Sequence, residues 1–177
     1  CLRAVAAVVD PALGMQAPPS VKAASGLDAL TQAIEGYYSV HATDLTEPLS
    51  LQGAALLTRS LRAFVTEPGD EAAAEACATG SLLAGLAFAN SRLGMVHGIV
   101  HPLSARTGEP HGKLCGILLP WALRFSQEAA PEKYDRLCAL VDADIAAFCE
   151  DLLREFDLPA DLQSLDLPPA LLPEIVA

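Results

Sequence analysis

The stretch Met95–Lys113 reads MVHGIVHPLSARTGEPHGK and holds three of the chain's four histidines. Its apolar residues are spaced as on helices, which predicts a short helix over 94–104 and a longer one over 110–128. His97 and His101 are four positions apart, so on a helix they share one face and lie about 6 Å apart along the axis. This stretch therefore favours a fold built from helices.

The third histidine, His111, stands at the start of the second of these helices, where a side chain is often presented to a site. Spacing alone leaves two interpretations open. Either the three histidines are core and capping residues that happen to be neighbours, or they converge on a site that needs imidazole nitrogen. A helix through His101 is compatible with Pro102, because the carbonyl group that the proline ring would press on belongs to Gly98. The HExxH motif of zincin proteases is absent from the sequence.

Helical spacing continues through most of the chain. Apolar periodicity, capping residues and prolines predict further helices over 21–39, 43–65, 71–90, 132–141 and 144–156. The run AVAAVV at 4–9 indicates one buried strand or a strand remnant, and 158–173 shows little periodicity. We therefore expect an all-α, bundle-like domain over 20–177, preceded by a short strand or linker over 1–19.

Composition and charge limit the classes of function that this protein can have. The net charge is −11 and the pI is near 4.6, and so acidic a surface repels phosphate backbones, which argues against nucleic-acid binding. The five cysteines form no CxxC pair, so we expect buried, reduced thiols in a cytoplasmic protein, Cys115 among them as a core residue. Neither a signal peptide nor a membrane span of about 18 apolar residues is predicted.

A second stretch, Ser25–Tyr37, reads SGLDALTQAIEGY and places Asp28 and Gln32 four positions apart on one helix face. Such a pair is commonly the solvated face of a helix. Asp28, however, is flanked by apolar residues, and a buried carboxylate needs a cation or a metal as its partner.

Several segments together resemble the iron-containing (group III) alcohol dehydrogenases. The resemblance is carried by GLDALTQAIEGYYS, by TDLTEPLSLQGAALL and by GSLLAGLAFANSRLGMVHGIVHPLSARTGEPHGKLCGILLP. The opening RAVAAVVDPALGMQAPPSVKAASG also fits the segment that links the two domains of these enzymes. The resemblance implies the dehydroquinate synthase-like C-terminal helical domain, without the N-terminal dinucleotide-binding domain.

The resemblance also implies a metal site. The family's ligand positions fall on Asp28, Gln32, His97 and His111, with Gln32 standing where most members carry histidine. Such a set suits a divalent metal, with Fe²⁺ expected first and Zn²⁺ or Mn²⁺ as alternatives, and the amide is a weaker ligand than imidazole. By the same resemblance His101 is a catalytic proton-relay group and Phe88 lines the substrate pocket.

The implied activity is hydride transfer between a small alcohol or aldehyde and NAD or NADP, with the isolated chain itself expected to be inactive. Two rival hypotheses are a helical fragment or interaction domain that keeps only the scaffold, and an unrelated metal hydrolase. The apolar face that would meet the missing domain makes a homo-oligomer an option. Substrate identity and the choice between NAD and NADP cannot be derived from these residues.

Overall fold

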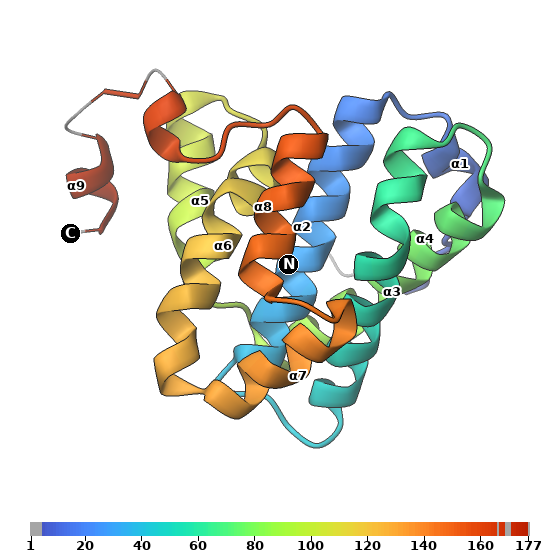
Figure 1. Cartoon of the computed structure of the whole chain (residues 1–177), viewed down its shortest axis with the longest axis horizontal. Helices are drawn as coiled ribbons and strands as arrows, with labels where there is room; N and C mark the ends of the chain where they lie inside the picture. Colours follow the sequence, from blue (N-terminus) through green and yellow to red (C-terminus); the bar gives the residue numbers. More distant parts are fainter. Residues whose placement is uncertain (1–4, 166, 169–170, 177) are drawn as a thin grey trace.

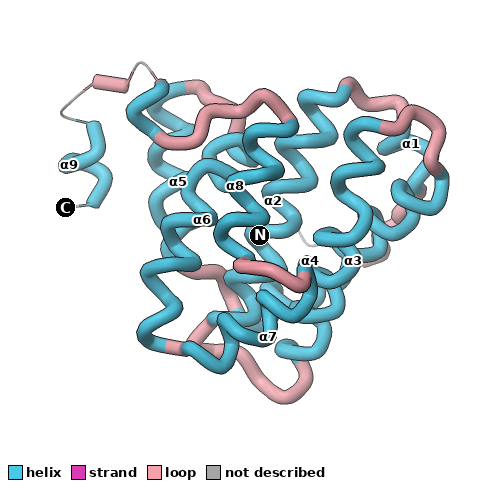
Figure 2. Tube along the Cα trace, in the orientation of Figure 1, coloured by secondary structure: helices cyan, strands magenta, loops and turns pink. Residues whose placement is uncertain are grey.

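The computed structural model describes residues 5–165, 167–168 and 171–176 (Figure 1). Its helices are α1 (Pro11–Met15), α2 (Pro19–Tyr38), α3 (Thr46–Thr66), α4 (Glu71–Ser91), α5 (Met95–Thr107), α6 (His111–Ala129), α7 (Pro131–Val141), α8 (Ile145–Glu155), the 3-10 turn η1 (Leu162–Ser164) and α9 (Leu171–Val176). Within these residues no strand is present (Figure 2), and the all-α prediction is confirmed.

Helix α2 lies between the α3–α4 pair on one side and α5 and α6 on the other (Figure 1). Of its 20 residues, 12 are buried, so it is covered on several faces rather than on a single stripe. Three of the buried residues, Lys22, Thr31 and Glu35, are polar or charged. Because buried polar groups require partners, this central helix is where an internal polar site is expected.

Helix α6 approaches α2 closely through glycines. A Cβ atom added at Gly112 would lie 2.1 Å from the carbonyl oxygen of Ala24, and one at Gly116 would lie 2.7 Å from the Cδ1 atom of Leu27. Only glycine fits against a neighbouring backbone at the first of these distances. The contact sets the first turn of α6, which begins at His111, directly against α2.

Helices α3 and α4 cross in a similar way, since a Cβ added at Gly53 would lie 2.9 Å from the carbonyl oxygen of Gly80. The buried face of α4 consists of small residues: Ala73, Ala74, Cys77, Gly80, Ala84, Ala87 and Ser91. By length and composition α4 is the one helix of the described chain apolar enough to cross a membrane, a test that the core helix of a soluble protein also passes. Here α4 packs along α3 and α2.

Helix α5 runs through Pro102, as the glycine at position 98 was expected to allow. It ends at Gly108, which adopts the left-handed conformation (φ 74°) that terminates many helices. This turn leads through Glu109 and Pro110 into α6. The stretch Met95–Lys113 therefore forms two helices joined by a short loop, as predicted.

The N-terminal segment was expected to form a short strand or a linker, and its described residues form no strand. Residues 5–10 form no strand, and Val5 and Val8 are almost fully exposed. A strand needs a neighbour for its backbone groups, and none of the described residues supplies one. The side chain of Asp10 instead accepts a hydrogen bond from the backbone N–H of Ala12 and caps the short helix α1, which was not predicted.

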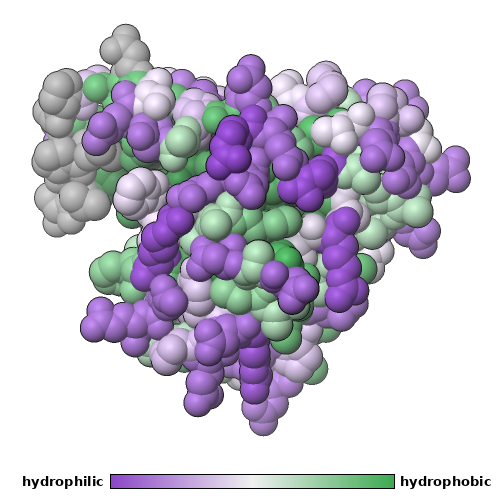
Figure 3. All heavy atoms as spheres, viewed as in Figure 1, coloured by the Kyte–Doolittle hydropathy of each residue, from purple (hydrophilic) through white to green (hydrophobic). Residues whose placement is uncertain are grey.

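Charged side chains lie mainly on the outside. Figure 3 shows bands of hydrophilic residues that cross more apolar surface on one face of the molecule. Exposed ion pairs link α8 to two neighbouring helices, Arg124 to Glu150 and Arg62 to Glu155. Each exposed pair contributes about 0–1 kcal/mol, so packing rather than surface charge holds the helices together.

Candidate metal centre

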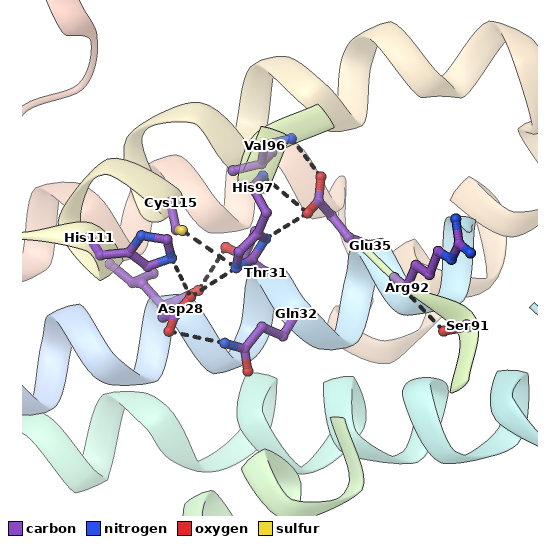
Figure 4. A network of polar contacts seen from close by, with 11 residues as sticks. Asp28, Thr31, Gln32, Glu35, Ser91, Arg92, Val96, His97, His111 and Cys115 are labelled. Atoms are coloured by element: carbon purple, nitrogen blue, oxygen red, sulfur yellow. Dashed lines mark hydrogen bonds and ion pairs between the residues drawn. The ribbon is translucent and has the colours of Figure 1, made fainter. Parts of the chain in front are cut away.

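Three helices bring the predicted residues to one place (Figure 4). Asp28 comes from the middle of α2, His97 from the first turn of α5 and His111 from the first residue of α6. One turn further along α6, the Cys115 thiol faces the same point. The sequence interpretation took Cys115 as a core residue, and it is indeed fully buried, but its sulphur belongs to this cluster.

The donor atoms of the cluster are close enough to share one cation. The Nε2 atom of His97 lies 3.2 Å from the Oδ1 atom of Asp28, and that of His111 lies 3.6 Å from the same oxygen. The Cys115 sulphur lies 3.8 Å from the Nε2 atom of His97, and all four donor atoms are within 4.8 Å of one another. Carboxylate, imidazole and thiolate are the groups that bind zinc and other divalent transition metals, so this donor set fits such an ion.

Gln32 lies beside the cluster and contacts it through Asp28. Its Nε2 atom donates to the Oδ2 atom of Asp28 at 3.1 Å, while the amide oxygen points away (Figure 4). To act as a ligand through that oxygen, the amide would have to turn over and give up this hydrogen bond.

Glu35 is a site residue that the sequence interpretation missed. It is buried, and its carboxylate accepts hydrogen bonds from the backbone N–H of Val96 at 2.6 Å and from the Nδ1 atom of His97 at 2.7 Å. A third, longer bond comes from the backbone N–H of His97. Glu35 thus caps the start of α5 and also orients the His97 ring, with the Nε2 atom directed at the cluster.

A signal for Glu35 was present in the sequence. Asp28, Gln32 and Glu35 stand at i, i+4 and i+7, and these positions lie on one face of a helix. The partner of Glu35 lies 62 positions further on, at His97, and local spacing contains no information on such a contact.

The charges of the cluster are strongly coupled. Burial opposes ionisation of Asp28, but its hydrogen bond with His97 and the charges of His97 and His111 outweigh burial and hold its pKa below 3.8. Burial likewise opposes protonation of His97, yet hydrogen bonds with Asp28, Cys115 and Glu35 raise its pKa to about 11. Burial raises the pKa of Cys115 to about 11 and lowers that of His111. An imidazolium at position 97 therefore balances the carboxylates when no other cation does so.

His101 lies at the outer edge of the cluster. Its side chain is exposed, and its ring centre is 5.7 Å from that of His97 and 5.1 Å from that of His111. Phe88 is half-buried on α4 and packs against α2 at Gly36, one turn beyond Gln32.

A cavity of about 570 Å³ lies between α2, α6 and the loop before α5. Glu35 lines it together with apolar residues of both helices, and Arg92 and His41 stand among its polar lining. Neither Phe88 nor His101 is among the residues that line this cavity.

The fold and the cluster define the class of protein: an all-α domain with a candidate site for a divalent cation between three of its helices. The model of the Fe-containing alcohol dehydrogenase family, C-terminal part, matches residues 22–177. The chain belongs to this family.

Individual relatives agree with this assignment. The chain is 44% identical over 117 residues to a lactaldehyde reductase of Escherichia coli, a match covering 66% of the chain and 30% of the relative. It superposes on a 1,3-propanediol oxidoreductase with a TM-score of 0.89 and 34% identity, over 94% of the chain and 47% of that structure. A sulfoacetaldehyde reductase from Bifidobacterium kashiwanohense, solved with NAD⁺, gives a TM-score of 0.82 and 30% identity, over 94% and 46%.

The chain thus spans less than half the length of these relatives. Their names describe oxidoreductases of alcohols and aldehydes, and one of the structures contains NAD⁺. The predictions of the family and of the helical fold are therefore confirmed.

Proposed function

We propose that the chain is the metal-binding half of an NAD(P)-dependent alcohol dehydrogenase, which transfers hydride between a small alcohol or aldehyde and the nicotinamide. The observation that supports this most is the convergence of Asp28, His97 and His111 from three helices in a member of this family. In this proposal the three side chains hold a divalent cation, and the family resemblance offers Gln32 as a candidate for the fourth ligand. The family description names iron, and Zn²⁺ and Mn²⁺ suit the same residues.

The residues of the chain then have separate roles. When bound, a divalent cation supplies Lewis-acid polarisation of a substrate oxygen. Glu35 fixes the His97 ring so that its Nε2 atom faces the site. His101 is exposed next to the other two rings, where an imidazole can carry a proton between the substrate and solvent. Phe88 forms part of the apolar wall for the substrate.

The nicotinamide site lies mainly in the dinucleotide-binding half, so we expect no turnover from this chain alone. A scaffold without catalysis is the second candidate function, because the chain spans under half of its relatives. We further propose a cytoplasmic location, small-molecule substrates rather than nucleic acid, and self-association as one option for its exposed apolar surface.

Metal binding tests the proposal directly. Protein freed of metal is dialysed against Fe²⁺, Zn²⁺ or Mn²⁺ and its bound metal is counted. We expect one ion per chain, with loss of that ion in Asp28→Asn and His111→Gln. His41→Gln is the matched control, because His41 lies outside the cluster, and it should retain the ion. A chain that binds none of the three ions would contradict the proposed role.

Two activity assays separate the rivals. Hydride transfer is measured with NAD(H) or NADP(H) and a panel of small alcohols, first for the chain and then for a protein in which it is joined to the dinucleotide-binding half. Turnover only in the joined protein supports the proposal, whereas none in either favours the scaffold. Ester or phosphate hydrolysis by the chain would favour the metal hydrolase instead.

A further inference from the structure

We infer that the Cys115 thiolate, and not the Gln32 amide oxygen, is the fourth protein ligand of the cation, and that the site consequently selects Zn²⁺. This inference rests on the proposed function, since it names the ligands and the ion of that same site. On binding, a sulphur–zinc bond replaces the S–H bond of Cys115 and a nitrogen–zinc bond replaces the Nε2–H bond of the His97 imidazolium, and both protons pass to solvent.

The position of Cys115 carries the argument. It lies one turn after His111 on α6, so both side chains project from the same helix towards α2. The two glycines that bring α6 close to α2, Gly112 and Gly116, directly follow these two residues and hold their helix face close to Asp28. The thiol is completely buried, and its sulphur contacts the Nε2 atom of His97 in the cluster.

Three of the six separations between the donor atoms agree with tetrahedral coordination, and all six are within 4.8 Å. With Zn–N and Zn–O bonds of about 2.1 Å and a Zn–S bond of about 2.3 Å, tetrahedral ligands lie roughly 3.4 Å apart for nitrogen and oxygen and roughly 3.6 Å apart for sulphur and nitrogen. The corresponding separations are 3.2 Å for His97 to Asp28, 3.6 Å for His111 to Asp28 and 3.8 Å for Cys115 to His97. Shifts of a few tenths of an ångström complete the cage at these three contacts.

Gln32 is engaged elsewhere. Oδ1 is the Asp28 oxygen that faces both imidazoles, whereas Gln32 donates to the other oxygen, Oδ2. This hydrogen bond leaves Oδ1 free to bind the cation and fixes the plane of the carboxylate. Gln32 therefore suits the role of a residue that orients a ligand rather than that of a ligand.

The donor set determines the ion. Asp28 and Cys115 supply two anionic donors, a carboxylate oxygen and a thiolate sulphur, beside the two imidazole nitrogens. Thiolate is a soft ligand that favours zinc, whereas Mn²⁺ prefers oxygen, so the Zn²⁺ preference should depend on the sulphur.

Cobalt(II) is a suitable probe, because it occupies zinc sites and gives a thiolate-to-metal charge-transfer band in the near ultraviolet when sulphur is bound. The full chain, freed of metal, is titrated with Co²⁺, and Zn²⁺ and Mn²⁺ affinities follow from competition with a chromophoric chelator. The variants are Cys115→Ser and Gln32→Ala. Cys77→Ser is the matched control, since Cys77 is also buried but pairs with Ser60. Circular dichroism checks that each variant is folded.

We expect the band in the wild type, in Gln32→Ala and in Cys77→Ser, and its absence in Cys115→Ser. Zn²⁺ affinity should fall about a hundredfold or more in Cys115→Ser, beyond the tenfold to hundredfold typical of residues that only orient a ligand, and Mn²⁺ affinity should change far less. Bound cobalt without the band, or a band that persists in Cys115→Ser, would overturn the inference and leave the proposed function standing. A chain that binds no cation would overturn both.

Discussion

Glu35→Gln is the substitution that most directly tests how the site is held together. The carboxylate is buried and accepts two short hydrogen bonds, from the Val96 backbone at 2.6 Å and from the Nδ1 atom of His97 at 2.7 Å. A glutamine of the same shape has one oxygen and one NH₂ group. If the oxygen keeps the Val96 bond, the NH₂ group faces the Nδ1 atom, which must then lose its proton and accept, so that the neutral ring is protonated at Nε2.

Glu35→Gln should lower both the stability of the fold and the affinity of the site for metal. The protein loses a charge-assisted bond worth about 1.5–3 kcal/mol and a charge at the start of α5 worth about 0.3–1 kcal/mol, so the free energy of unfolding should fall by about 2–4 kcal/mol. The proton of His97 also moves to the Nε2 atom, the nitrogen that faces the cluster. Metal affinity should therefore fall tenfold to a hundredfold, about 1.4–2.7 kcal/mol.

Urea denaturation of the metal-free chain measures the first loss, and chelator competition measures the second. Glu155→Gln is the control, because that exposed carboxylate pairs with Arg62 on the surface and should change unfolding by less than about 1 kcal/mol without affecting the metal. A Glu35→Gln protein with wild-type metal affinity would refute the reasoning that Glu35 sets the His97 tautomer.

Three further outcomes follow from the structure. The pKa of His97 is raised to about 11 in the folded chain from 6.5, so its stabilisation is complete below pH 6.5 and is lost as the pH rises towards 11. Urea titrations of the metal-free chain between pH 7 and 8, below the range in which the thiols titrate, should thus show the free energy of unfolding falling by up to about 1.4 kcal/mol per pH unit, with most of that slope absent in His97→Gln. Gly112→Ala should lower the free energy of unfolding by about 1–3 kcal/mol or more, because its Cβ would meet the Ala24 carbonyl. Gly85→Ala, with open space around the residue, should raise the free energy of unfolding by about 0.5–1 kcal/mol. Thermal or urea unfolding of both variants separates the effect of close packing from that of helix propensity. Zn²⁺ at a hundred times its dissociation constant for the wild type should raise the free energy of unfolding by about 2.7 kcal/mol. An equal effect in His111→Gln at that same Zn²⁺ concentration would place the ion elsewhere.

Local signals predicted the helices well. Asp70 and Asp144 cap α4 and α8 with their side chains, and the predicted helices begin and end within three residues of the observed ones. The small residues of α4 lie on more than one face of that helix: Ala74 is buried, whereas Ser81 is exposed and a Cβ added at Gly85 would meet nothing within 4 Å. A helix of small residues has several faces that fit a neighbour, and periodicity does not choose among them.

Local sequence signals predicted the residues of the site less well than they predicted the helices. Spacing placed His97 and His101 on one helix face but left a shared site undecided, and Asp28 joined them only through the family resemblance. The roles of Cys115 and Glu35 depend on partners from other helices, which no local pattern identifies. The approach of α6 to α2 at Gly112 is what turns these separate positions into one cluster, and it exists only in the packed structure.

The contact between Asp28 and His97 spans 69 positions, and His111 lies further along still. A ribosome must therefore synthesise well over half of this chain before the cluster has all its members. Helices α2 to α4 can pair earlier, because they are consecutive and pack on one another. Capture of a cation at this point would thus mark the synthesis of the first turns of α6, up to Cys115. Until then the carboxylates of Asp28 and Glu35 would lack their partners in the nascent chain.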